Sequence, residues 1–325
     1  MKSLMLTIII FTSKRLEQFI ELINDINIGN SKLNIPIIIV SYQEKIGNLR
    51  IIKKISKDYN YKLYIEKKKL SVAEKLKKYS KKIKTKYFWW ISDDDRITNN
   101  SINIINKLLK KNNNISGITL ANKSIHSIKL NKKTYPYNRK KFFLKNLDIK
   151  KKITALGMNS AQITSVKHYK DELKSFDKNE YHNTAYSYLN VIYKIIFKTN
   201  NWKYLNNKLV IYRVGNLDNV NKNLALKRLD NEFKGYLIPL KKKYKKEYYN
   251  DIFQEIFYKN IISHILLNFY INNRFKTFRI VLNNIELIPK KINIIISIIL
   301  IFATPYFILN FIKKIKILRS KLNMQ

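Results

Sequence analysis

The stretch that decides the fold reads Tyr87-Phe88-Trp89-Trp90-Ile91-Ser92-Asp93-Asp94-Asp95, an apolar run that stops at three consecutive aspartates. Such a continuous apolar run is typical of a strand buried on both faces of a parallel sheet. In open α/β sheets, ligands bind beyond the carboxyl ends of the strands, so the aspartates are expected at a binding edge. Three adjacent carboxylates repel one another, which predicts a hard divalent cation there. The alternative is an Asp-rich turn in which Asp95 or Thr98 caps the next helix.

Strands and helices alternate on both sides of this run. The sequence predicts strands at 6–11, 36–40, 61–65, 118–121 and 208–213, and helices at 15–26, 51–59, 71–83, 102–109 and 186–197. Ser71 is expected to cap the helix at 71–83, with Glu74 in its first turn. This order predicts an α/β fold with a Rossmann-like, mostly parallel sheet.

The composition limits the classes of function. The 325 residues include 64 Lys and Arg against 22 Asp and Glu, a formal net charge of +42, yet 46% are hydrophobic, which excludes a disordered polyelectrolyte. Only 9 of the basic residues are Arg, while 55 Lys, 54 Ile and 40 Asn share A/T-rich codons. A phosphate-gripping surface recruits Arg, so nucleic acid is disfavoured as a partner. The absence of Cys excludes disulfides, thiolate zinc sites and a cysteine nucleophile.

The character of the chain changes near residue 219. We interpret residues 1–218 as a catalytic domain and residues 219–325 as a helical, basic tail that associates with a membrane. Residues 292–312 are nearly all apolar, with lysines at both ends and Pro305 inside. This length is at the threshold for a span. We expect an in-plane or shallow hairpin anchor on the inner leaflet, with a spanning helix and a buried helix as alternatives.

The amino terminus has an apolar run like that of a signal peptide but lacks the other features of one. Its apolar run, residues 5–11, is followed at once by Lys14 and Arg15, with no small-residue cleavage site. A buried strand is therefore the better interpretation. We expect a cytoplasmic protein, peripheral on the cytoplasmic face of the cell membrane, with integral insertion as the alternative.

Four blocks, in order, resemble family-two glycosyltransferases. They are the first strand and turn (residues 6–15, LTIIIFTSKR), the helix before the metal strand (71–75, SVAEK), the aromatic strand ending in an Asp-any-Asp motif (87–95, YFWWISDDD), and a Tyr-Arg-any-Gly-Asn ending (209–216, LVIYRVGN). The last block is similar to bacterial surface-sugar members of the family, including abequosyltransferase-like ones. Together the blocks cover roughly residues 4–216.

The resemblance implies a GT-A fold and transfer of a sugar from a nucleotide-sugar donor to an acceptor hydroxyl. It implies Mg²⁺ or Mn²⁺ held by Asp93, Asp94 and Asp95, with the motif registered on Asp93 and Asp95 or centred on Asp94. It also implies donor-binding roles for Thr12, Ser13, Arg15, Tyr42, Lys75, Asp93, Asp94 and Arg213. One departure concerns the nucleobase: the family usually has an acidic pair after the second strand, and residues 40–43 read VSYQ here. Tyr42 could stack on the base or simply pack.

An inverting enzyme of this class needs a carboxylate base. Acids in the expected region are Asp171, Glu172, Asp177 and Glu180, with His182 beside them. Glu180 is the first choice and Asp177 the second, although each can instead be a helix N-terminal acid. Arg213 is expected to pair with the donor diphosphate, with a surface ion pair as the alternative.

The sequence thus indicates a metal-dependent, inverting glycosyltransferase that adds a hexose or deoxyhexose to a lipid-linked surface glycan such as a lipopolysaccharide. A nucleotidyltransferase is the enzymatic alternative, although the usual Gly-rich phosphate loop is missing after the first strand. A non-catalytic protein that binds nucleic acid or membrane surfaces is the other alternative.

Overall fold

The computed structural model describes residues 5–13, 15–31, 33–42, 46–68, 70–126, 144–174, 187–214, 222–243, 246–270, 274–289, 298 and 302. The chain divides into two compact units. The first consists of Met1–Asp148 with Ala155–Asp218, and the second of Ile149–Thr154 with Asn219–Gln325.

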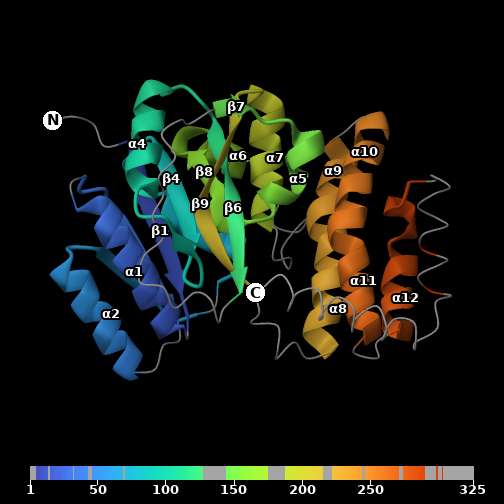
Figure 1. Cartoon of the computed structure of the whole chain (residues 1–325), viewed down its shortest axis with the longest axis horizontal. Helices are drawn as coiled ribbons and strands as arrows, with labels where there is room; N and C mark the ends of the chain where they lie inside the picture. Colours follow the sequence, from blue (N-terminus) through green and yellow to red (C-terminus); the bar gives the residue numbers. More distant parts are fainter. Residues whose placement is uncertain are drawn as a thin grey trace, which may run out of the picture. The chain divides into compact units, whose positions relative to one another are not determined.

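The first unit is built on a mixed sheet (Figure 1). Its strands are β1 (Leu6–Thr12), β2 (Ile37–Tyr42), β3 (Lys62–Glu66), β4 (Tyr87–Ser92), β5 (Arg96–Ile97), β6 (Gly117–His126), β7 (Leu144–Asn146), β8 (Gln162–Ser165) and β9 (Trp202–Val214). They run in the order β3-β2-β1-β4-β8-β6-β9-β5, and β7 pairs with β9. The pairings among β3, β2, β1 and β4 and between β6 and β9 are parallel, whereas β8 is antiparallel to both of its neighbours. The predicted α/β fold with a mostly parallel sheet is confirmed.

Helices cover both faces of this sheet. They are α1 (Leu16–Asn30), α2 (Ile46–Asp58), α3 (Val72–Ser80), α4 (Ser101–Lys111), α6 (Val166–Lys174) and α7 (Ser187–Thr199). Of α5 (Ile149–Leu156), residues Ile149–Thr154 are assigned to the second unit. Helix α1 packs on α4, and α3 packs on α6 and α7. Strand β4 packs against the helices on both faces of the sheet, because successive side chains of a strand point to opposite faces. Trp89 lies in the cluster that α1 and α4 share, whereas the Trp90 ring contacts Phe11 and Tyr188.

The predicted start of α3 is confirmed in detail. Ser71 Oγ accepts from the Glu74 backbone N–H at 3.3 Å, and Glu74 Oε2 accepts from the Ser71 backbone N–H at 2.8 Å. This reciprocal capping box satisfies two donors that the first helical turn leaves free.

The alternative in which Asp95 or Thr98 caps the next helix is wrong. Asn100 occupies the N-cap position of α4, and Arg96 and Ile97 first form the short strand β5 against β9. Thr98 Oγ1 instead forms a 2.7 Å hydrogen bond with Ser101 Oγ. The chain after the aspartates is therefore tied into the sheet before the helix begins.

The second unit is helical in its described part. It contains α8 (Lys222–Asn231), a π-helical turn (Glu232–Leu237), α9 (Ile238–Lys243), α10 (Lys246–Ile256), a second π-helical turn (Phe257–Ile261), α11 (Ile262–Tyr270), α12 (Arg274–Asn283) and a 3₁₀ turn (Ile285–Leu287). Among the residues described, no helix combines the length and apolarity needed to cross a bilayer. Of the predicted anchor at 292–312, only the helical residues Ile298 and Phe302 are described.

Gly117 packs directly against the ring of Trp202. A Cβ at this position would lie 2.4 Å from a ring carbon of Trp202. Trp202 cannot retreat easily, because its Nε1–H donates to Thr119 Oγ1 at 2.9 Å inside the sheet. We expect Gly117→Ala to lower the free energy of unfolding by about 1–3 kcal/mol. Urea unfolding measures the loss. Gly47→Ala is the matched control, because nothing lies within 4 Å of a Cβ there, and equal effects at both positions would contradict the packing argument.

Candidate active site

The ends of three parallel strands bring the predicted donor-binding residues to one edge of the sheet. Phe11 of β1 is opposite Ser92 of β4, and Thr12 is opposite Ser41 of β2. Thr12, Tyr42 and Asp93 therefore follow one another across neighbouring strand ends. This is the edge at which open α/β sheets bind ligands.

Arg15 joins two of the three aspartates. Its Nη1 lies 3.2 Å from Asp93 Oδ1 and 2.5 Å from Asp94 Oδ2. The Ser13 backbone N–H also donates to Asp93 Oδ2 at 3.1 Å. Because one nitrogen contacts both carboxylates, Asp93 and Asp94 converge on one point that takes positive charge. Two of the predicted donor-binding residues, Ser13 and Arg15, thus contact the acidic loop, residues 93–95.

The environment disfavours the charged form of Asp93. Burial, which is the largest cause, and the neighbouring Asp94 carboxylate together raise its pKa to about 6. Arg15 and the Ser13 N–H act in the opposite direction without cancelling the burial effect. A buried carboxyl whose pKa is raised beside a second carboxylate is a pattern that functional sites show.

Asp95 points into the protein and has a different set of partners. Its Oδ2 accepts a short hydrogen bond from Ser160 Oγ, and Ser160 Oγ in turn accepts from the Ser92 N–H at 2.9 Å. Trp89 Nε1–H fixes the Ser160 carbonyl at 2.7 Å. Burial and the Asp94 charge raise the pKa of Asp95 to about 7, although Ser160 lowers it. Sequence reasoning missed Ser160, since a serine in a short 3₁₀ turn carries no signal of this role.

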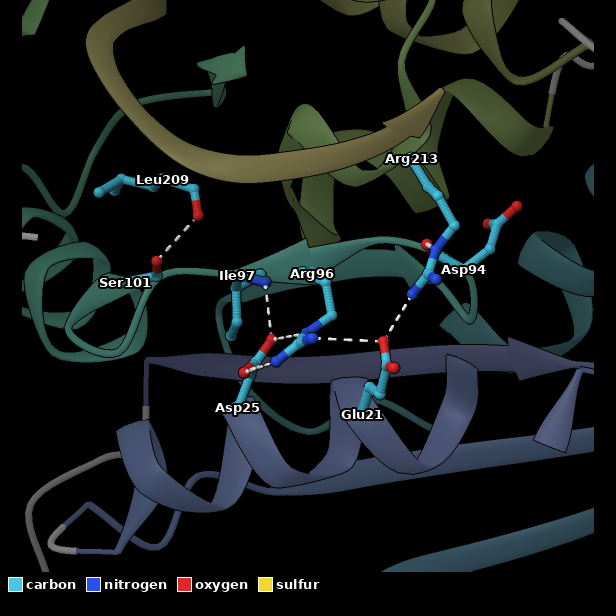
Figure 2. A network of polar contacts seen from close by, with 8 residues as sticks. All are labelled: Glu21, Asp25, Asp94, Arg96, Ile97, Ser101, Leu209 and Arg213. Carbon is cyan, nitrogen blue, oxygen red and sulfur yellow. Dashed lines mark hydrogen bonds and ion pairs between the residues drawn. The ribbon is translucent and has the colours of Figure 1, made fainter. Parts of the chain in front are cut away.

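Arg213 binds the backbone of the acidic loop and a side chain of α1 (Figure 2). Its Nε–H donates to the Asp94 carbonyl at 3.2 Å, and its Nη2 lies 2.6 Å from Glu21 Oε2. Arg213 thus forms an ion pair, as the alternative expected, but only 8% of its side chain is exposed. The guanidinium is already engaged with the loop and α1. Its predicted pairing with the donor diphosphate remains a prediction.

A second arginine continues this network (Figure 2). Arg96 binds Asp25 through Nε at 2.5 Å and Nη2 at 2.7 Å, and its Nη1 lies 3.2 Å from Glu21 Oε2. Asp25 is fully buried, and its burial raises its pKa against the effect of Arg96. Glu21 therefore bridges Arg96 of β5 and Arg213 of β9 and links α1 to both strands.

The remaining donor-binding predictions, Tyr42 and Lys75, lie near this edge. Tyr42 is buried at the end of β2, opposite Glu66 of β3. Lys75 Nζ lies 5.4 Å from the centre of the Phe11 ring. Glu66 accepts from Tyr79 and forms a 2.6 Å ion pair with Lys78. Whether Tyr42 and Lys75 bind a donor stays a prediction.

The predicted general bases divide into two groups. Glu180 and Asp177, with His182 beside them, lie outside the described residues. Asp171 and Glu172 lie on α6 and form ion pairs with Lys174 and Lys198, each at 3.0 Å. The choice of Glu180 stays a prediction.

A divalent cation fits the point on which Asp93 and Asp94 converge. In the described part of the chain, no three acidic or histidine side chains converge as metal ligands. Asp93 and Asp94 still offer two hard oxygen ligands at one point, and Mg²⁺ commonly combines one or two carboxylates with substrate phosphates. Asp93 and Asp94 would hold the ion, whereas Asp95 is occupied by Ser160.

The raised pKa of Asp93 gives metal binding a defined pH dependence. A bound cation requires the ionised carboxylate, so binding below about pH 6 must displace a proton. We expect the affinity for Mn²⁺ to fall about tenfold per pH unit below pH 6 and to level off above it. Titration of free Mn²⁺ by electron paramagnetic resonance between pH 5 and 8 measures this. Asp93→Asn should flatten the profile, and a flat profile in the unmodified protein would contradict the assignment.

Comparison with known proteins adds three solved structures. The sequence matches no family model and no curated protein. The structure is similar to S. aureus TarS 1-349, with a TM-score of 0.58, 11% identity, and coverage of 88% of this chain and 81% of that one. The complex of the same protein with UDP-GlcNAc gives a TM-score of 0.62, 12% identity, and coverage of 88% and 82%. The structure is also similar to the mannosyltransferase PcManGT from Pyrobaculum calidifontis, solved with GDP-Man and Mn²⁺. Here the TM-score is 0.53 and the identity 9%, and the match covers 93% of this chain and 81% of that one. At these identities the likeness establishes the fold: this chain folds as those sugar-nucleotide-binding proteins do.

Proposed function

We propose that this protein is a metal-dependent glycosyltransferase that moves a sugar from a nucleotide-sugar donor to an acceptor hydroxyl. The observation that carries the proposal is the convergence of Asp93 and Asp94 on one cationic group at the carboxyl edge of β1 and β4. The shared fold supports it, since similar structures hold UDP-GlcNAc in one case and GDP-Man with Mn²⁺ in another.

In this proposal the side chains have separate tasks. Asp93 and Asp94 hold Mg²⁺ or Mn²⁺, which when bound neutralises charge on the leaving nucleoside diphosphate. Arg15 is half exposed beside them and supplies a further positive charge to the donor phosphates. Ser160, Glu21 and Arg213 hold the acidic loop in position. Glu180, or Asp177, is the proposed base that takes the acceptor proton in an inverting reaction.

We further propose a lipid-linked surface glycan as the acceptor, reached from the cytoplasmic face of the membrane. The motif at 209–216, similar to surface-sugar glycosyltransferases, supports the glycan. The apolar segment 292–312 with its flanking lysines supports work at a lipid surface.

The test is nucleoside diphosphate release from a panel of UDP-, GDP-, CDP- and dTDP-sugars, with Mn²⁺, with Mg²⁺ or with EDTA. Release from one donor class that stops in EDTA supports the proposal. Pyrophosphate release from a nucleoside triphosphate would favour the nucleotidyltransferase alternative. Tight, salt-dependent nucleic-acid binding without any donor turnover would favour the non-catalytic one.

A further inference from the structure

Helix α12 turns an apolar stripe toward solvent. Phe275, Phe278, Leu282 and Ile285, which we call the α12 face, have exposed fractions of 90%, 43%, 44% and 60%. Their spacing of three, four and three residues places them along one side of the helix and its following 3₁₀ turn. Thr277 and Val281, on the other side, are buried in the unit. The helix thus has a buried side and, opposite to the usual pattern, an apolar outer side.

Basic residues accompany the stripe. Lys276 and Arg279 are exposed on the same helix. From residue 259 to the end, the sequence has 11 Lys and Arg and a single acid, Glu286. An apolar stripe bordered by Lys and Arg is the pattern of helices that lie in the interface of an anionic bilayer.

The stripe also adjoins the most apolar segment of the sequence. The Phe278 ring makes an edge-to-face contact with the Phe302 ring, with centroids 5.0 Å apart. Arg274 donates to the Phe302 carbonyl. Phe302 is a described residue of the apolar stretch 292–312, and Phe275 remains 90% exposed although Phe278 makes this contact.

We propose that the α12 face docks on an anionic lipid bilayer, with Phe275 and Leu282 entering the headgroup region and Lys276 and Arg279 meeting lipid phosphates. A second copy of this chain fits less well, because two strongly basic surfaces would repel each other. The proposal does not rest on glycosyl transfer, since lipid binding needs neither donor nor metal.

Vesicle co-sedimentation of the full chain tests the inference. Vesicles of phosphatidylcholine with about a third phosphatidylglycerol are compared with phosphatidylcholine alone. We expect binding to the anionic vesicles only, and a loss of about tenfold or more in Phe275→Ser/Leu282→Ser. Lys276→Gln/Arg279→Gln should weaken anionic binding severalfold. The matched control is Ile46→Ser/Ile65→Ser, two exposed apolar residues of the first unit, which should bind unchanged.

Three results would overturn the inference. One is unchanged vesicle binding by Phe275→Ser/Leu282→Ser, because the α12 face would then not contribute to lipid binding. Another is equal binding to neutral and anionic vesicles. The third is a concentration-dependent dimer that the same variant abolishes, because the face would then be a contact between copies. Far-ultraviolet circular dichroism establishes that each variant is folded.

Discussion

Asp94→Asn is expected to lower metal-dependent donor turnover by about 100-fold or more while leaving the protein folded. The substitution keeps the shape of the side chain and removes one of two charges that converge on Arg15. Metal catalysis depends on such ligands, because the ion neutralises charge on the leaving group. Asp93→Asn is expected to act similarly, through the other carboxylate.

Asp94→Asn should lose activity without losing stability. The Asp94 charge raises the pKa values of both Asp93 and Asp95, so its removal relieves repulsion in the apo protein. We therefore expect thermal unfolding of Asp94→Asn at or near the original temperature. Asp230→Asn is the matched control, since this aspartate forms a 2.7 Å ion pair with Lys234 in the second unit and belongs to none of the candidate site residues. Full turnover in Asp93→Asn and Asp94→Asn would refute the catalytic assignment.

Arg96→Met is expected to destabilise the first unit by about 3–5 kcal/mol. Asp25 has no exposed surface, and Arg96 meets it with two parallel hydrogen bonds at 2.5 and 2.7 Å. Without the guanidinium, the buried Asp25 carboxylate loses its charged partner. Of the hydrogen-bond donors described here, it keeps the Ile97 backbone N–H. Removing one member of a buried pair costs far more than removing both.

The double variant Asp25→Leu/Arg96→Met makes that argument quantitative. Two apolar side chains of similar volume should restore most of the lost stability, and urea unfolding of both single variants and the double variant gives the coupling energy. The exposed pair Asp171 and Lys174 provides the control, for which no measurable coupling is expected. Additive losses at Asp25 and Arg96 would contradict the account of this pair.

The first half of the fold could be predicted because its signals are local. Buried parallel strands give uninterrupted apolar runs, and the helices between them show an apolar face with a recognisable cap at Ser71. The aspartates stand out because they end the most apolar strand. Both features depend on neighbours in sequence, so the alternation of strands and helices along the chain from β1 to β4 could be predicted.

The second half depends on distant partners that the sequence does not reveal. Strand β8 reads Gln-Ile-Thr-Ser, and its polar side chains are buried because Gln162 binds Thr119 and backbone carbonyls. Strand β9 is 13 residues long, whereas its apolar part predicted only residues 208–213. Glu21 meets Arg213 across 192 residues, so its role in holding the acidic loop has no local pattern.

The most direct test of the central claim needs neither a donor sugar nor an acceptor. Thermal unfolding of the full chain is measured with UDP, GDP, CDP or dTDP, each with Mn²⁺ or with EDTA. A nucleotide at about 100 times its Kd adds about 2.7 kcal/mol of stability, which is a shift of several degrees. The account predicts such a shift for one nucleotide, only with Mn²⁺, and none in Asp93→Asn or Asp94→Asn. No shift with any nucleotide, or the same shift in EDTA and in both variants, would contradict it.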